Sequence, residues 1–341
     1  MRIAWFRANA PDTSNMLDDT ALLIAELRSL HEIDVVCAAD AHDFVWQHAQ
    51  HAWDISVYEL DNTPEHAFIW AYLLNYPGVV MLRSMDVMHL SAALFASRCI
   101  VTSTAASADL LRARGSDISV RIAPLGVGSS RDAARPNGDC AKVLVADNRD
   151  RGGDVVGRAL DRARQAGAMF ELLPPDASLN AADIVISPDW PPHRHVSTSV
   201  LTAMAAGKAV VTTEMDATAD WPAMDPQTWR PRGVAVSQPP IVVTVDPLDE
   251  EHSLMLAVRR LSSDAALREK LGAAAHAWWR HHATPRHAAM AWNQILEEAM
   301  QLSPPPRPES WPKQFSEDGT ELARDVLIEL AVPPTDILAR S

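Results

Sequence analysis

Residues 182–214 combine hydroxyl side chains with an order of elements that suits phosphate binding. An apolar run at 184–187 predicts a buried strand, a small-residue run ending at Gly207 predicts a helix, and 209–213 predicts a second strand. The helix follows the first strand, so its free N–H groups should lie at the carboxyl edge of a sheet. We therefore expect a phosphate or pyrophosphate there, although helix capping alone also explains the three hydroxyl residues, Ser197, Thr198 and Ser199.

Arginines lie at two places in the second half of the chain. Arg194 comes just before the hydroxyl turn, and Arg149 and Arg151 come before the first predicted helix. Guanidinium groups pair well with phosphate oxygens, which makes Arg149, Arg151 and Arg194 candidates for phosphate binding. A solvated turn with local Arg–Asp pairs is the alternative for the first two, and a surface loop with nothing bound is the alternative for Arg194 and His195. His193 and His195 lie two residues apart in that loop and could bind a metal together, but the sequence shows no third ligand for it, so we expect no metal site.

Strands and helices alternate through both halves of the chain, which predicts parallel sheets covered on both faces. We predict an α/β protein of two Rossmann-like doubly wound domains that face a cleft. The predicted strands are 3–6, 33–37, 55–58, 79–82, 99–102, 119–122, 142–146, 170–173, 184–187, 209–213 and 242–245. The predicted boundaries are an N-terminal domain at 1–128, a linker at 129–140, a C-terminal domain at 141–285 and terminal helices at 286–341.

Composition narrows the class of protein. A chain of 341 residues is long enough for two domains that each bury a core. The formal net charge of −14 opposes nucleic-acid binding, which needs clustered Lys and Arg. The three cysteines form no metal motif and no disulfide framework, so we expect a reducing, cytoplasmic location. We see no signal-peptide core and no apolar run long enough to cross a bilayer.

Residues 182–214 also resemble the donor-site segment of retaining GT-B glycosyltransferases, glycosyltransferase family 4. The family pattern reads roughly aDv…P…GE.S…LEAMAaGkPvv, and the residues in step with it are Ala182-Asp183, Ser197, Leu201, 203–208 and Val210-Val211. The resemblance extends over most of the chain. It includes the opening MRIAWF, the 57–80 stretch with its YPGVV, the PLGV of 124–127 and the late helix 267–279.

The resemblance implies glycosyl transfer from a nucleoside diphosphate sugar to an acceptor, with retention of configuration and no required cofactor or metal. The donor would lie in the C-terminal domain and the acceptor against the N-terminal domain, with the terminal helices crossing back to that domain. The acceptor stays open: a saccharide, a lipid-linked molecule or a protein. Arg149 and Arg151 would clamp the donor diphosphate, and His195 would adjoin the donor sugar, so these three are the catalytic candidates.

Several family positions are altered in this chain. The two donor-site glutamates fall near His195 and Thr202, and a threonine gives a ribose one hydrogen bond but no bidentate charged contact. That loss costs about 1.5–3 kcal/mol of binding. Ser14 and Asn15 stand in the turn where the family has a glycine beside the donor phosphate. The alternative to an enzyme is therefore a catalytically degenerate GT-B protein that binds a nucleotide or a partner.

Three polar residues are candidates for the acceptor side: His66, Arg83 and Asp86. His66 matches a family histidine that faces the cleft, although a histidine at the start of a helix more often caps or packs. Arg83 stands where the family has a His-Asp pair, and both Arg83 and Asp86 follow a buried strand. We expect at least one of them to face the cleft, with Arg83 in contact with an anion or the acceptor.

Overall fold

The computed structural model describes residues 1–11, 18–85, 94, 96–113, 119–129, 140–146, 154–188, 196–232, 238–304, 306 and 320–334. Contacts divide the chain into two units. The first unit is Met1–Asp12, Leu23–Ala123 and Ala289–Ser341. The second unit is Thr13–Leu22 and Pro124–Ala288. Each unit is built on its own sheet.

The first unit contains a six-stranded sheet of order β2-β1-β3-β4-β5-β6, in which all neighbouring strands are parallel. The strands are β1 (Arg2–Phe6), β2 (Glu32–Val36), β3 (Ile55–Leu60), β4 (Val79–Leu82), β5 (Cys99–Thr102) and β6 (Ser119–Ile122). Every residue of β3, β4 and β5 is buried, as expected for strands covered on both faces. The strand order reverses between β1 and β3, which makes this the topological switch point of the sheet.

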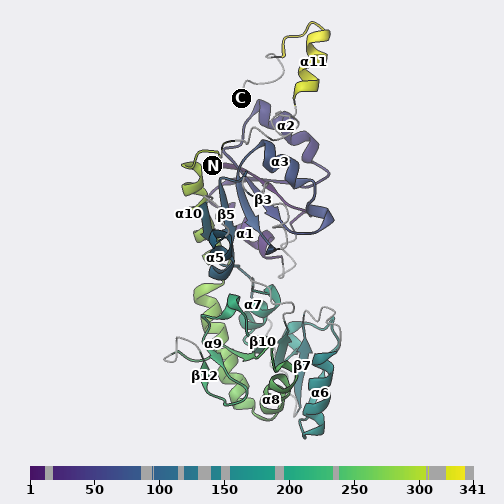
Figure 1. Ribbon diagram of the computed structural model, residues 1–341, viewed down its shortest axis with the longest axis vertical. Coiled ribbons are helices and arrows are strands. Elements are labelled where there is room, and N and C mark those ends of the chain that lie inside the picture. The colour runs from purple at the N-terminus through teal and green to yellow at the C-terminus, as the bar shows by residue number, and fades with distance from the viewer. Residues whose placement is uncertain are drawn as a thin grey trace. The chain divides into compact units, whose positions relative to one another are not determined.

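Helices from both ends of the sequence flank this sheet (Figure 1). They are α1 (Asp19–Leu27, in this unit from Leu23 on), α2 (Ala41–Gln50), the 3-10 turn η1 (Pro64–His66), α3 (Ile69–Asn75), α5 (Ala105–Ala113) and α10 (Pro285–Met300, in this unit from Ala289 on). The unit also contains α11 (Glu321–Glu329), which buries none of its residues. Trp292 of α10 packs on Trp5 of β1 with ring centroids 5.3 Å apart, and both rings are buried. An ion pair of 2.8 Å between Arg121 and Glu298 also ties α10 to β6.

The second unit contains a seven-stranded sheet of order β12-β11-β13-β10-β9-β7-β8, parallel except for the β11–β12 pair. The strands are β7 (Ala141–Val145), β8 (Phe170–Leu172), β9 (Ile184–Ser187), β10 (Ala209–Thr213), β11 (Ala223–Met224), β12 (Pro231–Arg232) and β13 (Val242–Val245). The helices and turns are α6 (Val155–Gln165), η3 (Leu179–Ala181), α7 (Thr198–Ala205), η4 (Asp216–Thr218), α8 (Glu250–Ser263) and α9 (Ala265–His282). The prediction of two doubly wound parallel-sheet α/β domains is confirmed.

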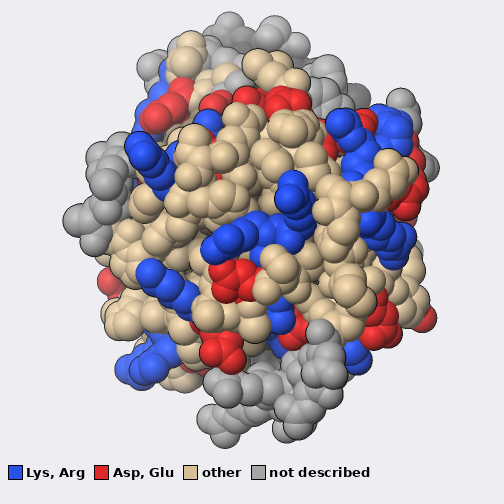
Figure 2. Space-filling model, turned by 90° about the horizontal axis from the view of Figure 1, so that it is seen from below, with Lys and Arg blue, Asp and Glu red and all other residues tan. Residues whose placement is uncertain are grey.

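Two apolar layers enclose the second sheet. One layer joins Ile184, Val211 and Val243 to α6 and α8, and the other joins Val185, Val210 and neighbouring residues to α7 and α9. This division follows the alternation of side chains along each strand, since successive residues point to opposite faces. Basic and acidic side chains are interspersed over the molecular face drawn in Figure 2. No helix of the described residues has the length and apolar character that crossing a membrane requires.

Candidate functional site

The sheet of the second unit reverses its strand order between β7 and β9. Ligands of doubly wound sheets bind at the carboxyl ends of the strands beside such a switch point. Four of the predicted site residues belong to the two segments that leave these strands: Arg149 and Arg151 between β7 and α6, and Arg194 and His195 between β9 and α7. All four lie outside the described residues. Their roles stay predictions; what the structure describes is that β7 and β9, which precede these residues in the chain, end at the expected edge of the sheet.

Helix α7 begins at this edge with a capped first turn. Ser197 is the N-cap residue in an extended conformation, and its Oγ accepts a hydrogen bond of 3.1 Å from the backbone N–H of Ser199. The Oγ1 of Thr202 donates to the carbonyl of Thr198 at 2.8 Å, and Thr202 is only 4% exposed. The predicted hydroxyl residues are therefore together on one short helix. Two of their hydroxyls are engaged in its backbone, as the capping alternative requires.

Replacing Ser197 by alanine is expected to lower the free energy of unfolding by about 1 kcal/mol, since it removes the side-chain acceptor of the first turn. The measurement is chemical denaturation of the intact protein. Ser263→Ala is the matched control, because that exposed serine donates to carbonyls at the end of α8 and caps no N–H group. An equal loss in both variants would contradict the capping role of Ser197.

A row of buried hydroxyls lies at the carboxyl ends of three neighbouring strands. Ser187 of β9, Thr212 of β10 and Thr244 of β13 are in register and are 0%, 1% and 3% exposed. Side chains two residues apart on a strand point to the same face of the sheet. The three hydroxyls are therefore on the same face as Val185 and Val210, which is the face that α7 covers. Ser187 Oγ and Thr212 Oγ1 have no hydrogen-bond partner among the described residues. The sequence analysis missed both, although apolar strands that end in hydroxyl residues were a visible signal.

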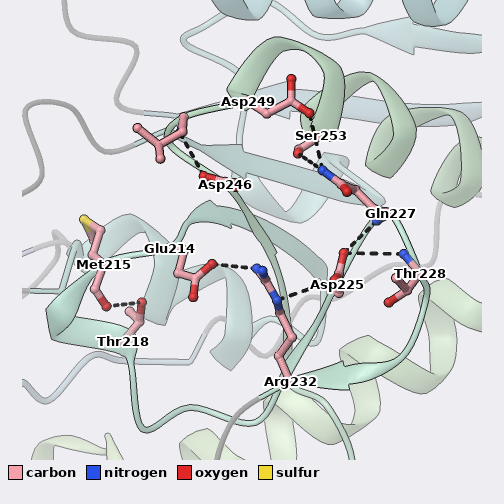
Figure 3. A network of polar contacts seen from close by, with 11 residues as sticks. Glu214, Met215, Thr218, Asp225, Gln227, Thr228, Arg232, Asp246, Asp249 and Ser253 are labelled. Carbon is pink, nitrogen blue, oxygen red and sulfur yellow. Dashed lines mark hydrogen bonds and ion pairs between the residues drawn. The ribbon is translucent and has the colours of Figure 1, made fainter.

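A polar network lies at the same edge of the sheet, on the side of β11 and β12 (Figure 3). Arg232 reaches Glu214 at 2.5 Å and Asp225 at 3.5 Å, so the carboxylate that follows β10 is already paired. The side-chain amide of Gln227 donates to Asp249 and Ser253 at 3.3 and 3.4 Å. These contacts hold the segment that contains β11 and β12 against the start of α8. The sequence analysis did not find this network, because its members are spread over 40 residues and no local pattern joins them.

Lys208, in the family-like AMAAGK run, lies at the opposite end of the sheet, before β10. Its Nζ donates to the carbonyl of Asn180 at 2.8 Å. Burial lowers the pKa of this lysine, and the nearby Asp183 opposes the shift. Lys208 therefore anchors the η3 turn and is not a member of the carboxyl-edge site.

The carboxyl edge of the first sheet carries a buried charge cluster at its own switch point. Glu59 near the end of β3 lies between Arg7, which follows β1, and Arg83, which follows β4. The nearest N–O distances are 3.5 Å to each arginine. We call these three residues the Arg–Glu–Arg cluster. Of its members the sequence analysis named only Arg83, although a charged residue in a buried strand and another directly after β1 were signals of such a cluster.

His66 lies close to the Arg–Glu–Arg cluster. Its ring Nδ1 shares a hydrogen bond of 2.9 Å with the hydroxyl of Thr63 at the start of the η1 turn. Burial lowers the pKa of His66, the positive charges of Arg83 and Arg7 lower it further, and Asp61 opposes them. The structure thus brings together two of the predicted acceptor-side residues, His66 and Arg83. Asp86, like Ser14 and Asn15 on the donor side, lies outside the described residues.

The described residues contain no group of three or more His, Cys, Asp or Glu side chains arranged to hold a metal ion. The cysteines Cys37, Cys99 and Cys140 are all free thiols, and burial raises the pKa of Cys99 to about 11. Among the described residues, hydroxyl side chains gather at the carboxyl edge of the second sheet, and paired charged side chains gather at the carboxyl edge of the first.

Comparison with solved structures finds the same architecture in glycosyltransferase structures. Anabaena HepE in complex with UDP-glucose aligns with a TM-score of 0.59 and 13% identity, over 87% of this chain and 100% of that one. HepE in complex with UDP and glucose gives a TM-score of 0.57 at the same identity and coverage. The chain has the GT-B fold.

A variant of TarM from S. aureus, in complex with fondaparinux, alpha-GlcNAc-glycerol and UDP, aligns with a TM-score of 0.52 and 9% identity. The alignment covers 74% of this chain and 58% of the TarM chain. No protein-family model matches the chain, and no curated protein matches its sequence. At these identities the likeness establishes the fold and not the activity.

Proposed function

We propose that this protein is a glycosyltransferase that moves a sugar from a nucleoside diphosphate sugar to an acceptor, with retention of configuration as in glycosyltransferase family 4. The observation that carries the proposal is the capped N-terminus of α7 at the carboxyl edge of the second sheet. A helix N-terminus at that edge attracts phosphate through its N–H groups and dipole. HepE, which shares the fold, binds UDP-glucose in its crystal structure.

The proposed donor site extends from this helix to both segments beside the switch point. Arg149, Arg151 and Arg194 neutralise the leaving diphosphate, and His195 lies beside the donor sugar. Stabilising charge where it develops is usually the largest catalytic contribution, and three arginines can supply it at the diphosphate. The remaining proposed donor contacts are Ser14, Asn15, Ser197, Thr198, Ser199 and Thr202.

The proposed acceptor side is the carboxyl edge of the first sheet, with His66, Arg83 and Asp86. In this proposal residues 1–128 form the acceptor domain, 141–285 form the donor domain, 129–140 link them and 286–341 complete the first. The reaction needs no cofactor beyond the donor. The three free thiols favour a reducing compartment, which supports a cytoplasmic location.

Thermal unfolding in the presence of UDP, GDP, dTDP, ADP or CMP, each with and without a divalent metal, tests the donor site. A nucleotide at 100 times its Kd is expected to stabilise the protein by about 2.7 kcal/mol. Arg151→Ala and Arg194→Ala are each expected to weaken that binding about tenfold, since each removes a charge-assisted pair with phosphate. Arg259→Ala, on the exposed face of α8, is the control and should bind as the unaltered protein does.

A shift with one nucleotide identifies the donor, and NMR of the product formed with an acceptor then reports the anomeric configuration. Unchanged affinity in both arginine variants would refute the proposed phosphate contacts. No shift with any nucleotide would favour the degenerate, partner-binding alternative. One observation already supports that alternative: Thr202, where the family has its ribose-binding glutamate, is buried and hydrogen-bonded within α7.

A further inference from the structure

Helix α11 presents an apolar stripe to solvent. Leu322 and Val326 of the helix and Leu330, directly after it, are 78%, 45% and 67% exposed. Each residue turns a helix by about 100°, so side chains four residues apart follow one another along one side. No residue of α11 is buried. Single apolar side chains are common on protein surfaces, whereas apolar side chains that adjoin one another mark an interaction site.

The C-terminal end of α11 is defined by two hydrogen bonds. The N–H of Ala331 donates to the carbonyl of Ile328 at 3.0 Å, and the N–H of Val332 donates to the carbonyl of Leu327 at 2.8 Å. This pair of bonds is the Schellman motif, which usually has glycine where this chain has Ala331. Ala331 has φ +57°, a left-handed conformation that alanine adopts less readily than glycine. Replacing Ala331 by glycine should therefore strengthen this end of the helix.

Helix α11 has little stability of its own. It is nine residues long, and isolated helices shorter than about 12–15 residues are marginal in water. Asp325 and Glu329 are four residues apart, and like charges at this spacing oppose a helix. Most helical stability in proteins comes from covering an apolar face. We therefore expect α11 to form fully when a partner covers the stripe.

Carboxylates line one edge of the stripe. Asp325 and Glu329 each precede a residue of the stripe, so both lie on the side of it that is away from Leu327. Both side chains are exposed, and among the described residues neither has a hydrogen bond or an ion pair. The arginine of the helix, Arg324, donates from Nε to Thr320 Oγ1 at 2.7 Å on a different side of the helix. This edge of the stripe is therefore acidic.

The acidic edge distinguishes between the surfaces that could cover the stripe. An antiparallel pair of two α11 helices brings the two acidic edges together, and a parallel pair sets each of them against Ala323 and Leu327. Neither arrangement supplies a positive charge. An anionic membrane repels both the edge and the protein, whose formal net charge is −14. A partner with Lys or Arg beside an apolar stripe covers the stripe and also pairs with the carboxylates.

We propose that α11 is a docking helix for a protein partner that presents an amphipathic helix edged by Lys or Arg. Leu322, Val326 and Leu330 are its apolar anchors, as in other complexes in which an amphipathic helix lays its apolar face on a partner. Asp325 and Glu329 select the partner by charge. The proposal does not depend on glycosyl transfer, since no residue of α11 belongs to the proposed donor or acceptor side.

Methyl NMR of the full-length protein, labelled at Ile, Leu and Val methyl groups, tests the docking surface residue by residue. The probe is a synthetic helical peptide with Leu at heptad positions a and d and Lys at e and g. One matched peptide has Glu in place of Lys, and another keeps Lys but has Gln in place of Leu. We expect saturable shifts of Leu322, Val326 and Leu330 with the Lys peptide, and at least tenfold weaker binding of the other two.

Variants of α11 separate the stripe from its acidic edge. Val326→Asp should weaken binding of the Lys peptide at least tenfold, because it interrupts the centre of the stripe. Ile328→Asp is the matched control: this side chain is 62% exposed on the same helix but lies outside the stripe, so binding should not change. The double variant Asp325→Lys with Glu329→Lys should prefer the Glu peptide. Ala331→Gly should bind the Lys peptide several-fold more tightly, because its helix is formed in advance.

Equal binding of the Lys and Glu peptides, or binding of the Lys peptide that persists in Val326→Asp, overturns the proposal. Stripe shifts that grow with protein concentration in the absence of peptide, together with a dimer in sedimentation equilibrium, assign the stripe to a second copy and overturn it too. Stripe shifts with phosphatidylcholine vesicles but not with the Lys peptide assign it to a lipid surface, with the same consequence. Circular dichroism checks that each variant is folded, so that weaker binding reports the docking surface.

Discussion

Replacing Glu59 by glutamine is expected to lower the free energy of unfolding of the first unit by about 3 kcal/mol. The substitution keeps the shape of the side chain but removes the charge that lies between Arg7 and Arg83. Removing one partner of a buried ion pair costs about 3–5 kcal/mol, because the remaining charge is left without compensation. The lower end applies here, since Arg83 is partly exposed and water compensates part of its charge.

Differential scanning calorimetry checks this expectation, because the first-unit transition should move to lower temperature while the second-unit transition stays in place. Glu65→Gln is the control: that carboxylate is exposed on the η1 turn, and its loss should change the stability by less than about 0.5 kcal/mol. If Glu59→Gln lost less than about 1 kcal/mol, solvent and other groups would already compensate the two arginines, and their ion pairs with Glu59 would contribute little to stability.

Replacing Gly272 by alanine is expected to destabilise the second unit by about 2–3 kcal/mol, the upper part of the range of about 1–3 kcal/mol for forcing extra carbon atoms into a packed site. A Cβ at Gly272 of α9 would lie 2.0 Å from the carbonyl oxygen of Gly207 and 2.8 Å from its carbon. Both atoms are backbone, so no side-chain rotation relieves the clash. Gly207 has φ +69°, a left-handed conformation that ends α7 and favours glycine.

The sign of this effect distinguishes packing from helix propensity. In an unhindered helix the exchange of glycine for alanine stabilises by about 0.5–1 kcal/mol. Ala273→Gly, on the exposed face of the same helix, is the matched control and should cost about 1 kcal/mol. Urea denaturation of both variants decides the matter. If the Gly272→Ala variant were more stable than the unaltered protein, α7 and α9 would have moved apart to make room for the methyl group at no cost in free energy.

Strands with continuous apolar sequence were predictable to within one or two residues. The predicted 184–187 and 209–213 coincide with β9 and β10, since a run of branched apolar residues bounded by polar ones satisfies only a buried strand. Helix α2 was not predicted. Its sequence AHDFVWQHAQ buries only Ala41 and Phe44 completely, so it shows no apolar stripe of helical period. The two-residue strands β11 and β12 also escaped prediction, because they exist only through pairing with each other and with β13.

The candidate site also has a part that the sequence predicts and a part that it does not. The cap of α7 was predictable, because Ser197 and the N–H that it accepts from are two residues apart. The Arg–Glu–Arg cluster was not, since its three residues come together only through the strand order of the sheet. Strand β3 was expected to end at residue 58, directly before the charged Glu59. It extends to Leu60 because two arginines from neighbouring strands compensate Glu59.

Because Trp292 packs on Trp5, the first unit cannot finish folding until the second unit has been synthesised. When β6 leaves the ribosome, the sheet of the first unit is complete in strands but still lacks α10, which would cover Trp5. At 5–20 residues per second the ribosome needs roughly 10–30 s more to reach that helix. The second unit is complete a few residues before Trp292, since it ends at Ala288. A chain truncated after residue 288 would therefore carry a complete second unit and a first unit whose Trp5 lacks the cover of Trp292, which makes it a substrate for chaperones.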